Sequence, residues 1–122
     1  MNQGIALFIP WAKLYSGLKN IKNIKIDKNF TTTNLESSYY CFSLIVKNVK
    51  SKTRNKILVD LKKRKIGCSV HYPKIVPDFF FYKKKLNINK KKFKFANILS
   101  ENSINLPVGP HLSSKNIEKV IY

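Results

Sequence analysis

The stretch RNKILVDLKKRKIGCSVHYP, residues 54–73, decides the fold. Ile57, Leu58 and Leu61 recur at helical spacing, and the lysines gather near the end of this segment, where positive charge suits the helix dipole. Gly67 predicts the end of that helix, in the left-handed conformation (φ > 0) that glycine adopts at helix ends. A short strand, CSV, should follow, and the proline of His-Tyr-Pro should end it, because proline cannot donate a sheet hydrogen bond.

The segment before this helix predicts the centre of a sheet. YYCFSLIV, residues 39–46, is rich in β-branched and aromatic residues, and its apolar character throughout favours a strand covered on both faces. We expect CSV to lie beside it. Further upstream, Trp11 to Leu18 has helical periodicity with Pro10 in its first turn, and IKNIKI reads as a short strand. The polar stretch DKNFTTTNLESS reads as a loop.

The segments after it complete an α+β pattern. Residues 72–92 hold two prolines and two lysine runs and predict mostly loop. FKFANILSEN predicts a helix, SINLP a strand, and Ser113 caps a last helix with Ile117, Val120 and Ile121 on its buried side. This order predicts an α+β fold, with a small, mainly antiparallel sheet and helices packed on one face.

Composition narrows the class of protein. The chain has 122 residues and 43% hydrophobic residues, but no apolar run approaches the ~20 residues of a membrane span. It lacks the pattern of a signal peptide, so we expect a cytoplasmic protein with Cys41 and Cys68 reduced.

The net charge is +18, yet only Arg54 and Arg64 are arginine. This lysine excess favours a compositional bias over a nucleic-acid-reading face. A small basic nucleic-acid-binding protein remains the alternative function.

Taken in order, these pieces resemble the C-terminal part of the DegT/DnrJ/EryC1/StrS family, the PLP-dependent sugar aminotransferases. WAKLYSGLKN, YYCFSLIV, the helix with Gly and His-Tyr-Pro, and FANILSENSINLPVGPHLSSKNIEKVI all match, so that the resemblance covers residues 11–122. It departs from the family at Ile75, Pro77 and the Phe93–Phe95 stretch. The resemblance implies a linking helix and loop from a large domain in residues 1–36. It implies a C-terminal small α+β domain of a fold-type I PLP aminotransferase in residues 37–122.

The resemblance also implies an activity. The family transfers an amino group, usually from glutamate, to a keto-sugar carried on a nucleotide, in amino-sugar and surface polysaccharide biosynthesis. The full-length enzymes are homodimers that bind pyridoxal 5'-phosphate (PLP) in a domain N-terminal to this region. That domain also supplies the Schiff-base lysine. We therefore expect a C-terminal portion that binds no PLP and is inactive alone, with no catalytic residue and no specific nucleic-acid or membrane partner.

His71 and Tyr72 are the candidate site residues. A metal-binding role for His71 lacks partners, because His111 is the only other histidine and no acidic cluster lies near either. From the residues alone, one interpretation of His71 is a strand-end side chain that hydrogen-bonds to the backbone and has no further role. The resemblance implies that His71 and Tyr72 contact the nucleotide-sugar substrate. The aromatic run Phe79–Tyr82 has two interpretations, an aromatic wall for a sugar or base, or a hydrophobic anchor for the long loop.

Overall fold

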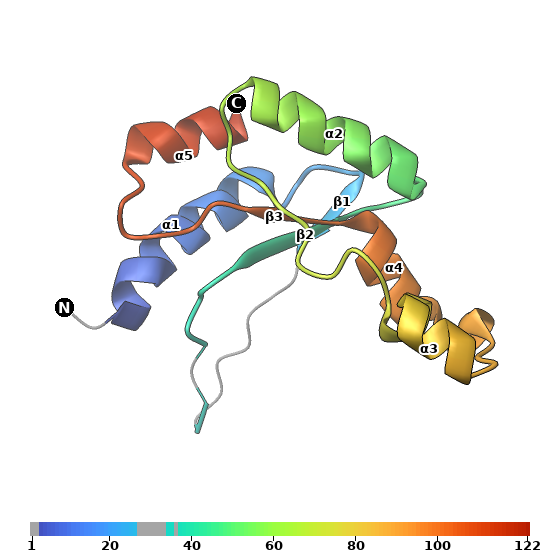
Figure 1. The fold of residues 1–122 in the computed structure, drawn as a ribbon. Coiled ribbons are helices and arrows are strands. Elements are labelled where there is room, and N and C mark those ends of the chain that lie inside the picture. The colour runs from blue at the N-terminus through green and yellow to red at the C-terminus, as the bar shows by residue number, and fades with distance from the viewer. Residues whose placement is uncertain (1–2, 27–33, 36) are drawn as a thin grey trace.

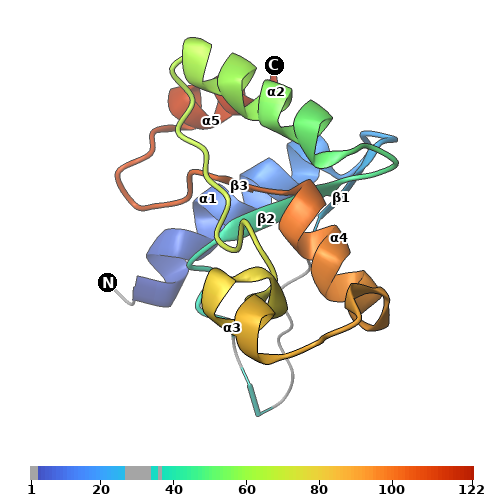
Figure 2. The same cartoon turned by 45° about the vertical axis from the view of Figure 1, so that its right-hand side comes forward.

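The computed structural model describes residues 3–26, 34–35 and 37–122 (Figure 1). Within these residues the chain forms helices and strands that Figures 1 and 2 show from two sides. The helices are α1 (Gln3–Leu18), α2 (Ser51–Lys63), α3 (Phe80–Lys85), α4 (Lys94–Asn102) and α5 (Ser114–Ile121), and the strands are β1 (Ile24–Ile26), β2 (Phe42–Val46) and β3 (Ser103–Leu106). No helix among the described residues is long and apolar enough to cross a membrane.

The three strands form one antiparallel sheet in the order β1-β2-β3. In its register Leu44 of β2 lies opposite Ile26 of β1 on one side and Ile104 of β3 on the other. The predicted α+β class and antiparallel sheet are therefore confirmed. The predicted domain boundary between residues 36 and 37 stays a prediction, and most of the expected loop of residues 27–38 lies outside the described residues.

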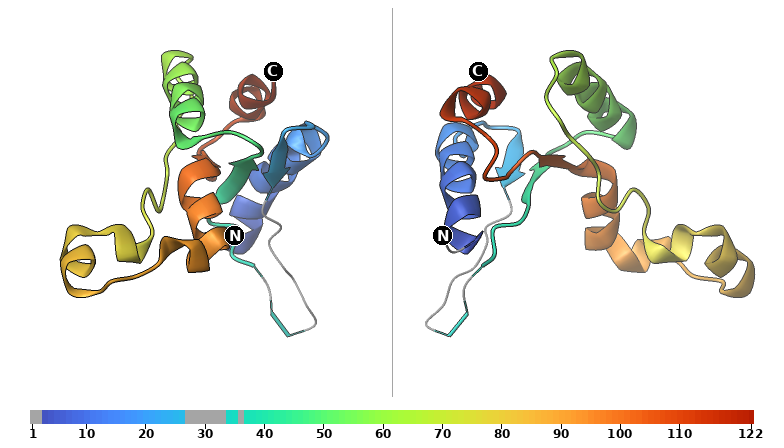
Figure 3. Two further views of the ribbon diagram at one scale, coloured as in Figure 1. Left: turned by 90° about the vertical axis from the view of Figure 1, so that its right-hand side faces the viewer. Right: turned by 60° about the vertical axis from the view of Figure 1, so that its left-hand side comes forward.

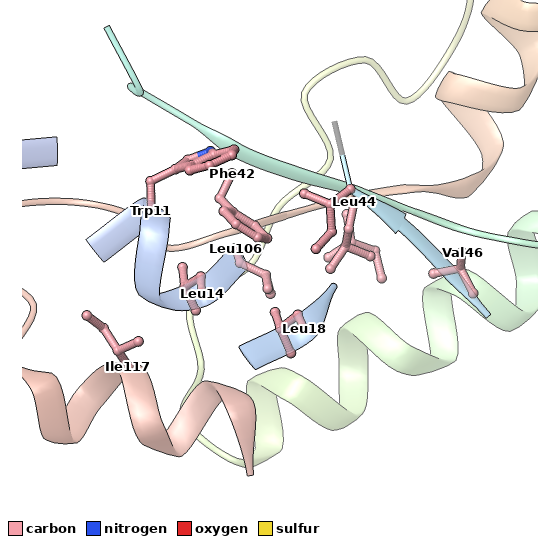
Figure 4. Packing of buried hydrophobic residues seen from close by; sticks show 10 residues of the cluster. Trp11, Leu14, Leu18, Phe42, Leu44, Val46, Leu106 and Ile117 are labelled. Atoms are coloured by element: carbon pink, nitrogen blue, oxygen red, sulfur yellow. The ribbon is translucent and has the colours of Figure 1, made fainter. Parts of the chain in front are cut away.

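The core lies on one face of the sheet. Phe42, Leu44 and Val46 alternate along β2 and are buried. Their partners in Figure 4 come mainly from α1, β3 and α5. The buried members of this cluster are Trp11, Leu14, Leu18, Ile26, Phe42, Leu44, Val46, Ile104, Leu106 and Ile117. The predicted inward face of α2, namely Ile57, Leu58 and Leu61, packs against the cluster and is confirmed.

The expectation that this strand is covered on both faces is wrong. Ser43 and Ile45 point away from the core and are only half-buried. Because successive side chains of a strand point to opposite faces, only every second residue of the long apolar run points into the core. The other face of β2 is left accessible.

The first and last helices of the described chain pack on each other. Leu14 of α1 is fully buried in the same cluster as Ile117 of α5. The backbones approach closely at Gly17, where an added Cβ would lie 2.5 Å from Cδ1 of Ile121. Helix α5 starts with the predicted Ser113 cap, whose hydroxyl accepts from the Asn116 N–H at 3.2 Å. Helix α1 begins well before Trp11, so Pro10 lies inside it rather than in its first turn.

The end of α2 differs from the prediction. The left-handed residue is Lys65 (φ 59°), and Gly67 does not have a positive φ. The Lys65 N–H donates to the Lys62 carbonyl at 2.9 Å, and the Ile66 N–H donates to the Leu61 carbonyl at 3.0 Å. This pair of bonds is a Schellman motif, which satisfies the last carbonyls of the helix and buries Ile66. The helix therefore ends at Lys63, and its left-handed residue lies two positions before the glycine.

Residues 68–70 also lie beside a different strand from the one predicted. Ser69 forms an isolated antiparallel bridge with Asn105 of β3, not with β2. The position next to β2 is already occupied on both sides by β1 and β3. The chain therefore reaches His71 along the outer edge of β3.

The segment expected to be mostly loop contains a helix. Helix α3 follows a 3-10 turn at Val76–Asp78, and another 3-10 turn at Lys90–Phe93 leads into α4. Figure 3 shows α3 projecting beyond α4, far from α1 and α5. We call residues 76–93 the projecting arm.

Candidate functional site

The open face of the sheet forms the floor of a groove with a volume of about 710 Å³. We call it the sheet groove. The half-buried side chains Ser43 and Ile45 of β2 form part of its lining, between β1 and the residues that follow α2. The lining residues are Tyr15, Lys19, Ile24, Lys25, Ile26, Tyr40, Cys41, Ser43, Ile45, Lys47, His71, Tyr72, Leu99, Ser103 and Asn105.

Both predicted substrate-contacting residues line this groove. His71 and Tyr72 are exposed, and 75% of Tyr72 is accessible. Their rings meet edge to face with centroids 6.4 Å apart. The structure therefore brings the two residues together at an accessible wall.

The backbone around His71 is held on both sides. Before it, the Ser69 N–H donates to the Asn105 carbonyl at 3.1 Å, and the Asn105 N–H donates back to the Ser69 carbonyl at 2.9 Å. After it, the Ser100 hydroxyl donates to the Tyr72 carbonyl at 2.9 Å. His71 thus stands between two fixed points on an otherwise irregular segment.

The groove offers hydrogen-bonding and positive groups. The Ser43 hydroxyl donates to Oδ1 of Asn105, a buried amide on the floor. Lys19, Lys25 and Lys47 are exposed at the lining and add positive charge. Hydroxyl, amide, imidazole and ammonium groups in one groove can bind a polar ligand that carries hydroxyls and a negative charge.

The lining does not fit PLP as a resident cofactor. A PLP site needs a lysine for the Schiff base together with an acidic partner for the pyridinium nitrogen. Among the described residues the lining contains three lysines but no carboxylate. The described part of the chain also holds no group of three or more His, Cys, Asp or Glu side chains that could bind a metal ion.

Sequence reasoning missed a buried charged residue beside the groove. Arg54 of α2 is 4% exposed, and its Nη1 donates to the carbonyls of Ser100 at 3.1 Å and Ser103 at 2.8 Å. Burial lowers the pKa of Arg54, and the nearby Glu101 carboxylate partly offsets this effect. The available signal was that Arg54 is one of only two arginines in a lysine-rich chain.

The aromatic run does not belong to the groove. Phe79–Tyr82 is absent from its lining, and each side chain is between 40% and 74% exposed. The run does not anchor the loop by burial, because its side chains are exposed and Ile75 is the residue buried at the base of the projecting arm. The aromatic-wall interpretation stays a prediction. Asp78 ties the arm together through ion pairs with Lys83, at 3.6 Å, and with Lys90.

Comparisons with known proteins point to one family. The chain matches the DegT/DnrJ/EryC1/StrS aminotransferase family over residues 10–122. Its fold is similar to that of Spr1654 from Streptococcus pneumoniae, which is described as a sugar aminotransferase and was solved in a PLP-form. The TM-score is 0.84 at 26% identity, and the match covers 97% of this chain and 29% of that one. No curated protein matches the chain.

More distant solved structures show the same fold. DesV from S. venezuelae has a TM-score of 0.80 at 21% identity, covering 97% of this chain and 30% of that one. PseC from Helicobacter pylori, an aminotransferase of pseudoaminic acid biosynthesis, has a TM-score of 0.80 at 18% identity, with coverage of 97% and 30%. The chain therefore spans less than a third of the length of these proteins.

Proposed function

Because the chain belongs to the DegT/DnrJ/EryC1/StrS aminotransferase family, we propose that it is the C-terminal portion of a cytoplasmic PLP-dependent aminotransferase acting on nucleotide-linked keto-sugars. The family match over residues 10–122 carries this proposal, and the fold likeness to sugar aminotransferases supports it. The amino donor would be glutamate, and the aminated sugar would serve surface polysaccharide biosynthesis. The working enzyme would be a homodimer.

The chain alone would have no transaminase activity. PLP is the group that carries the amino nitrogen in this chemistry. Among the residues that the structure describes, the lining of the sheet groove has no carboxylate of the kind that such a site needs. The cofactor site would therefore belong to the region of the relatives that has no counterpart here, and this chain would contribute to substrate binding.

His71 and Tyr72 would contact the nucleotide-sugar. Imidazole and phenol groups both donate and accept hydrogen bonds, as sugar hydroxyls and diphosphate oxygens require. Both residues are exposed at the wall of the sheet groove, where three lysines add positive charge. This arrangement suits a ligand that is polar and anionic.

A chimaera tests the proposed activity. The part of the S. pneumoniae protein that matches this chain would be replaced by this chain, which aligns over 97% of its length. Transfer of an amino group from glutamate to a UDP-linked keto-sugar is the readout. A chimaera that folds and binds PLP but transfers no amino group to UDP- or dTDP-linked keto-sugars would contradict the proposal.

The same chimaera tests His71. We expect His71→Ala to lower kcat/KM by roughly 5- to 150-fold, because it loses one hydrogen bond of about 1–3 kcal/mol to a charged group. The melting temperature should hardly change, because His71 is exposed. His111→Ala is the matched control, since His111 is exposed and absent from the groove lining. Unchanged kinetics in His71→Ala would show that His71 is a strand-end residue that makes no contact with the substrate.

A further inference from the structure

Ser100 of α4 is a buried serine whose hydroxyl forms a hydrogen bond to the backbone of the groove wall. Only 4% of this residue is exposed, although serine is usually found at the surface. Its hydroxyl donates to the Tyr72 carbonyl at 2.9 Å, across 28 residues of sequence. The bond joins α4 to an irregular segment that has no regular sheet ladder beyond Ser69.

The position of Ser100 is itself fixed by α2. The Ser100 carbonyl accepts from Nη1 of Arg54, and the same nitrogen donates to the Ser103 carbonyl at the start of β3. A guanidinium is planar and always charged, so it holds two carbonyls in a defined geometry. Arg54 therefore fixes both ends of the turn from α4 into β3.

We propose that Ser100 is a positioning residue that orients His71 and Tyr72, and that Arg54 holds Ser100 in place. The two side chains are exposed, so their direction depends on the backbone that carries them. That backbone is held at Ser69 by β3 and at Tyr72 by Ser100, and loss of the second bond frees the wall of the groove. The importance of this orientation for substrate rests on the proposed function.

Backbone relaxation of the full 122-residue chain, measured by NMR, tests the tether directly. In the native chain we expect order parameters at His71 and Tyr72 near the ~0.85 of rigid backbone, and in Ser100→Ala we expect them below ~0.6. The Tyr72 carbonyl ¹³C resonance should also move upfield when it loses its donor. Ser100→Cys, which keeps a weaker donor of similar shape, should fall between the two and serves if Ser100→Ala does not fold.

Ser113→Ala is the matched control. Like Ser100→Ala, it removes one serine hydroxyl that forms hydrogen bonds, in this case at the cap of α5. Ser113 does not line the sheet groove. We expect it to lower the melting temperature without changing the order parameters at residues 71 and 72. Equal order parameters in Ser100→Ala and the native chain, or an equal loss in Ser113→Ala, would overturn the proposal.

A titration separates the tether from the proposed function. UDP-N-acetylglucosamine is the probe, followed through the His71 and Tyr72 resonances of the same variants. If the native chain binds it, Ser100→Ala should bind about two- to tenfold more weakly, the effect of one lost hydrogen bond. Equal affinity would overturn the positioning role. No binding by the native chain would count against the substrate role of His71, while the order parameters would still decide the tether.

Discussion

Arg54 is buried in a chain whose described lysines are exposed or half-exposed. Its guanidinium donates to two backbone carbonyls and, through Nε, to Oδ1 of Asn55 at 2.8 Å. A buried carbonyl that loses its donor costs free energy, because no water replaces the lost bond. The stability of the joint between α2, α4 and β3 therefore depends on this one side chain.

We expect Arg54→Ala to lower the free energy of unfolding by about 3 kcal/mol, because the carbonyls of Ser100 and Ser103 lose a charged donor. Arg54→Lys should recover only part of this, since an ammonium lacks the planar fork. Urea denaturation followed by circular dichroism measures the change. Arg64→Ala is the control, because Arg64 is exposed and should change stability by less than about 0.5 kcal/mol. Equal effects at the two positions would refute the structural role of Arg54.

Sequence reasoning proposed His71 and Tyr72 as site residues but did not indicate the residues that hold them. His71 and Tyr72 could be singled out because they stand in a recognisable motif before a proline. The bonds from Arg54 to Ser100 and from Ser100 to Tyr72 join residues 46 and 28 positions apart, and nothing local in the sequence marks them. The prediction at Gly67 failed for a related reason, because it used only the local preference of glycine for the left-handed conformation at a helix end. In the structure Ile66 is buried, and the left-handed residue comes earlier, at Lys65.

At the scale of elements, α1 and α5 meet where α1 has no side chain. A Cβ at Gly17 would lie 2.5–2.9 Å from three carbon atoms of the Ile121 side chain. These contacts are shorter than carbon atoms tolerate, so a larger residue must displace α5 or Ile121. The close approach explains a glycine within an otherwise regular helix.

Gly17→Ala should therefore destabilise the chain, although alanine is the better helix former. Overpacking costs about 1–3 kcal/mol, against a helix-propensity gain of about 1 kcal/mol. Shortening the opposing side chain in Gly17→Ala/Ile121→Ala should remove the clash. A double-mutant cycle measured by thermal unfolding gives the coupling between the two sites. Additive effects would show that the helices do not meet at this point.

The projecting arm depends on Asp78. The Lys90 side chain, with Lys83, holds the pKa of the Asp78 carboxyl below its usual value. A lowered pKa means that this contribution to stability is present above the unfolded pKa of about 3.9 and is lost as the pH falls through the folded value. The ¹³C resonance of the Asp78 carboxyl should therefore titrate with a midpoint below about 3.9.

Asp78→Asn should loosen the arm and speed tryptic cleavage after Lys83, Lys84 and Lys85. Asp60→Asn is the matched control, because Asp60 forms only an exposed pair with Lys63 at 3.8 Å. The cleavage rate at the arm should be unchanged in that variant. Equal rates in Asp78→Asn and the native chain would show that the ion pairs do not hold the arm.

The elements with strong periodicity were predictable and the projecting arm was not. Ile57, Leu58 and Leu61 give α2 a clear apolar stripe, and Ser113 marks the start of α5, so both helices were expected. Helix α3 has only six residues, with aromatic residues and then lysines in succession, so it carries no helical stripe. The ion pairs of Asp78 with Lys83 and Lys90 hold α3 and its flanking turns together, and a sequence pattern does not show them.

At the scale of the whole molecule, the net charge of +18 is spread over many elements. Lysines occupy α2, α3 and the turn before α4, and three more line the sheet groove. Distributed lysines without an arginine-rich reading face give sequence-independent attraction to polyanions.

We therefore expect only weak DNA binding that is lost between low and physiological salt. Fluorescence anisotropy with two duplexes of unrelated sequence, at 50 mM and 200 mM salt, measures it. The affinity should fall by orders of magnitude and should not differ between the duplexes. A clear preference for one duplex at physiological salt would promote the nucleic-acid alternative.

The packing of α1 against α5 has a consequence for synthesis on the ribosome. Leu14 and Ile117 lie in one buried cluster, although about a hundred residues separate them. A ribosome adds roughly 5–20 residues per second, so the apolar side of α1 waits for seconds before its partner leaves the exit tunnel. During that interval the nascent chain presents Trp11, Leu14 and Leu18 without their final cover, which makes it a candidate client for chaperones that hold apolar segments during translation.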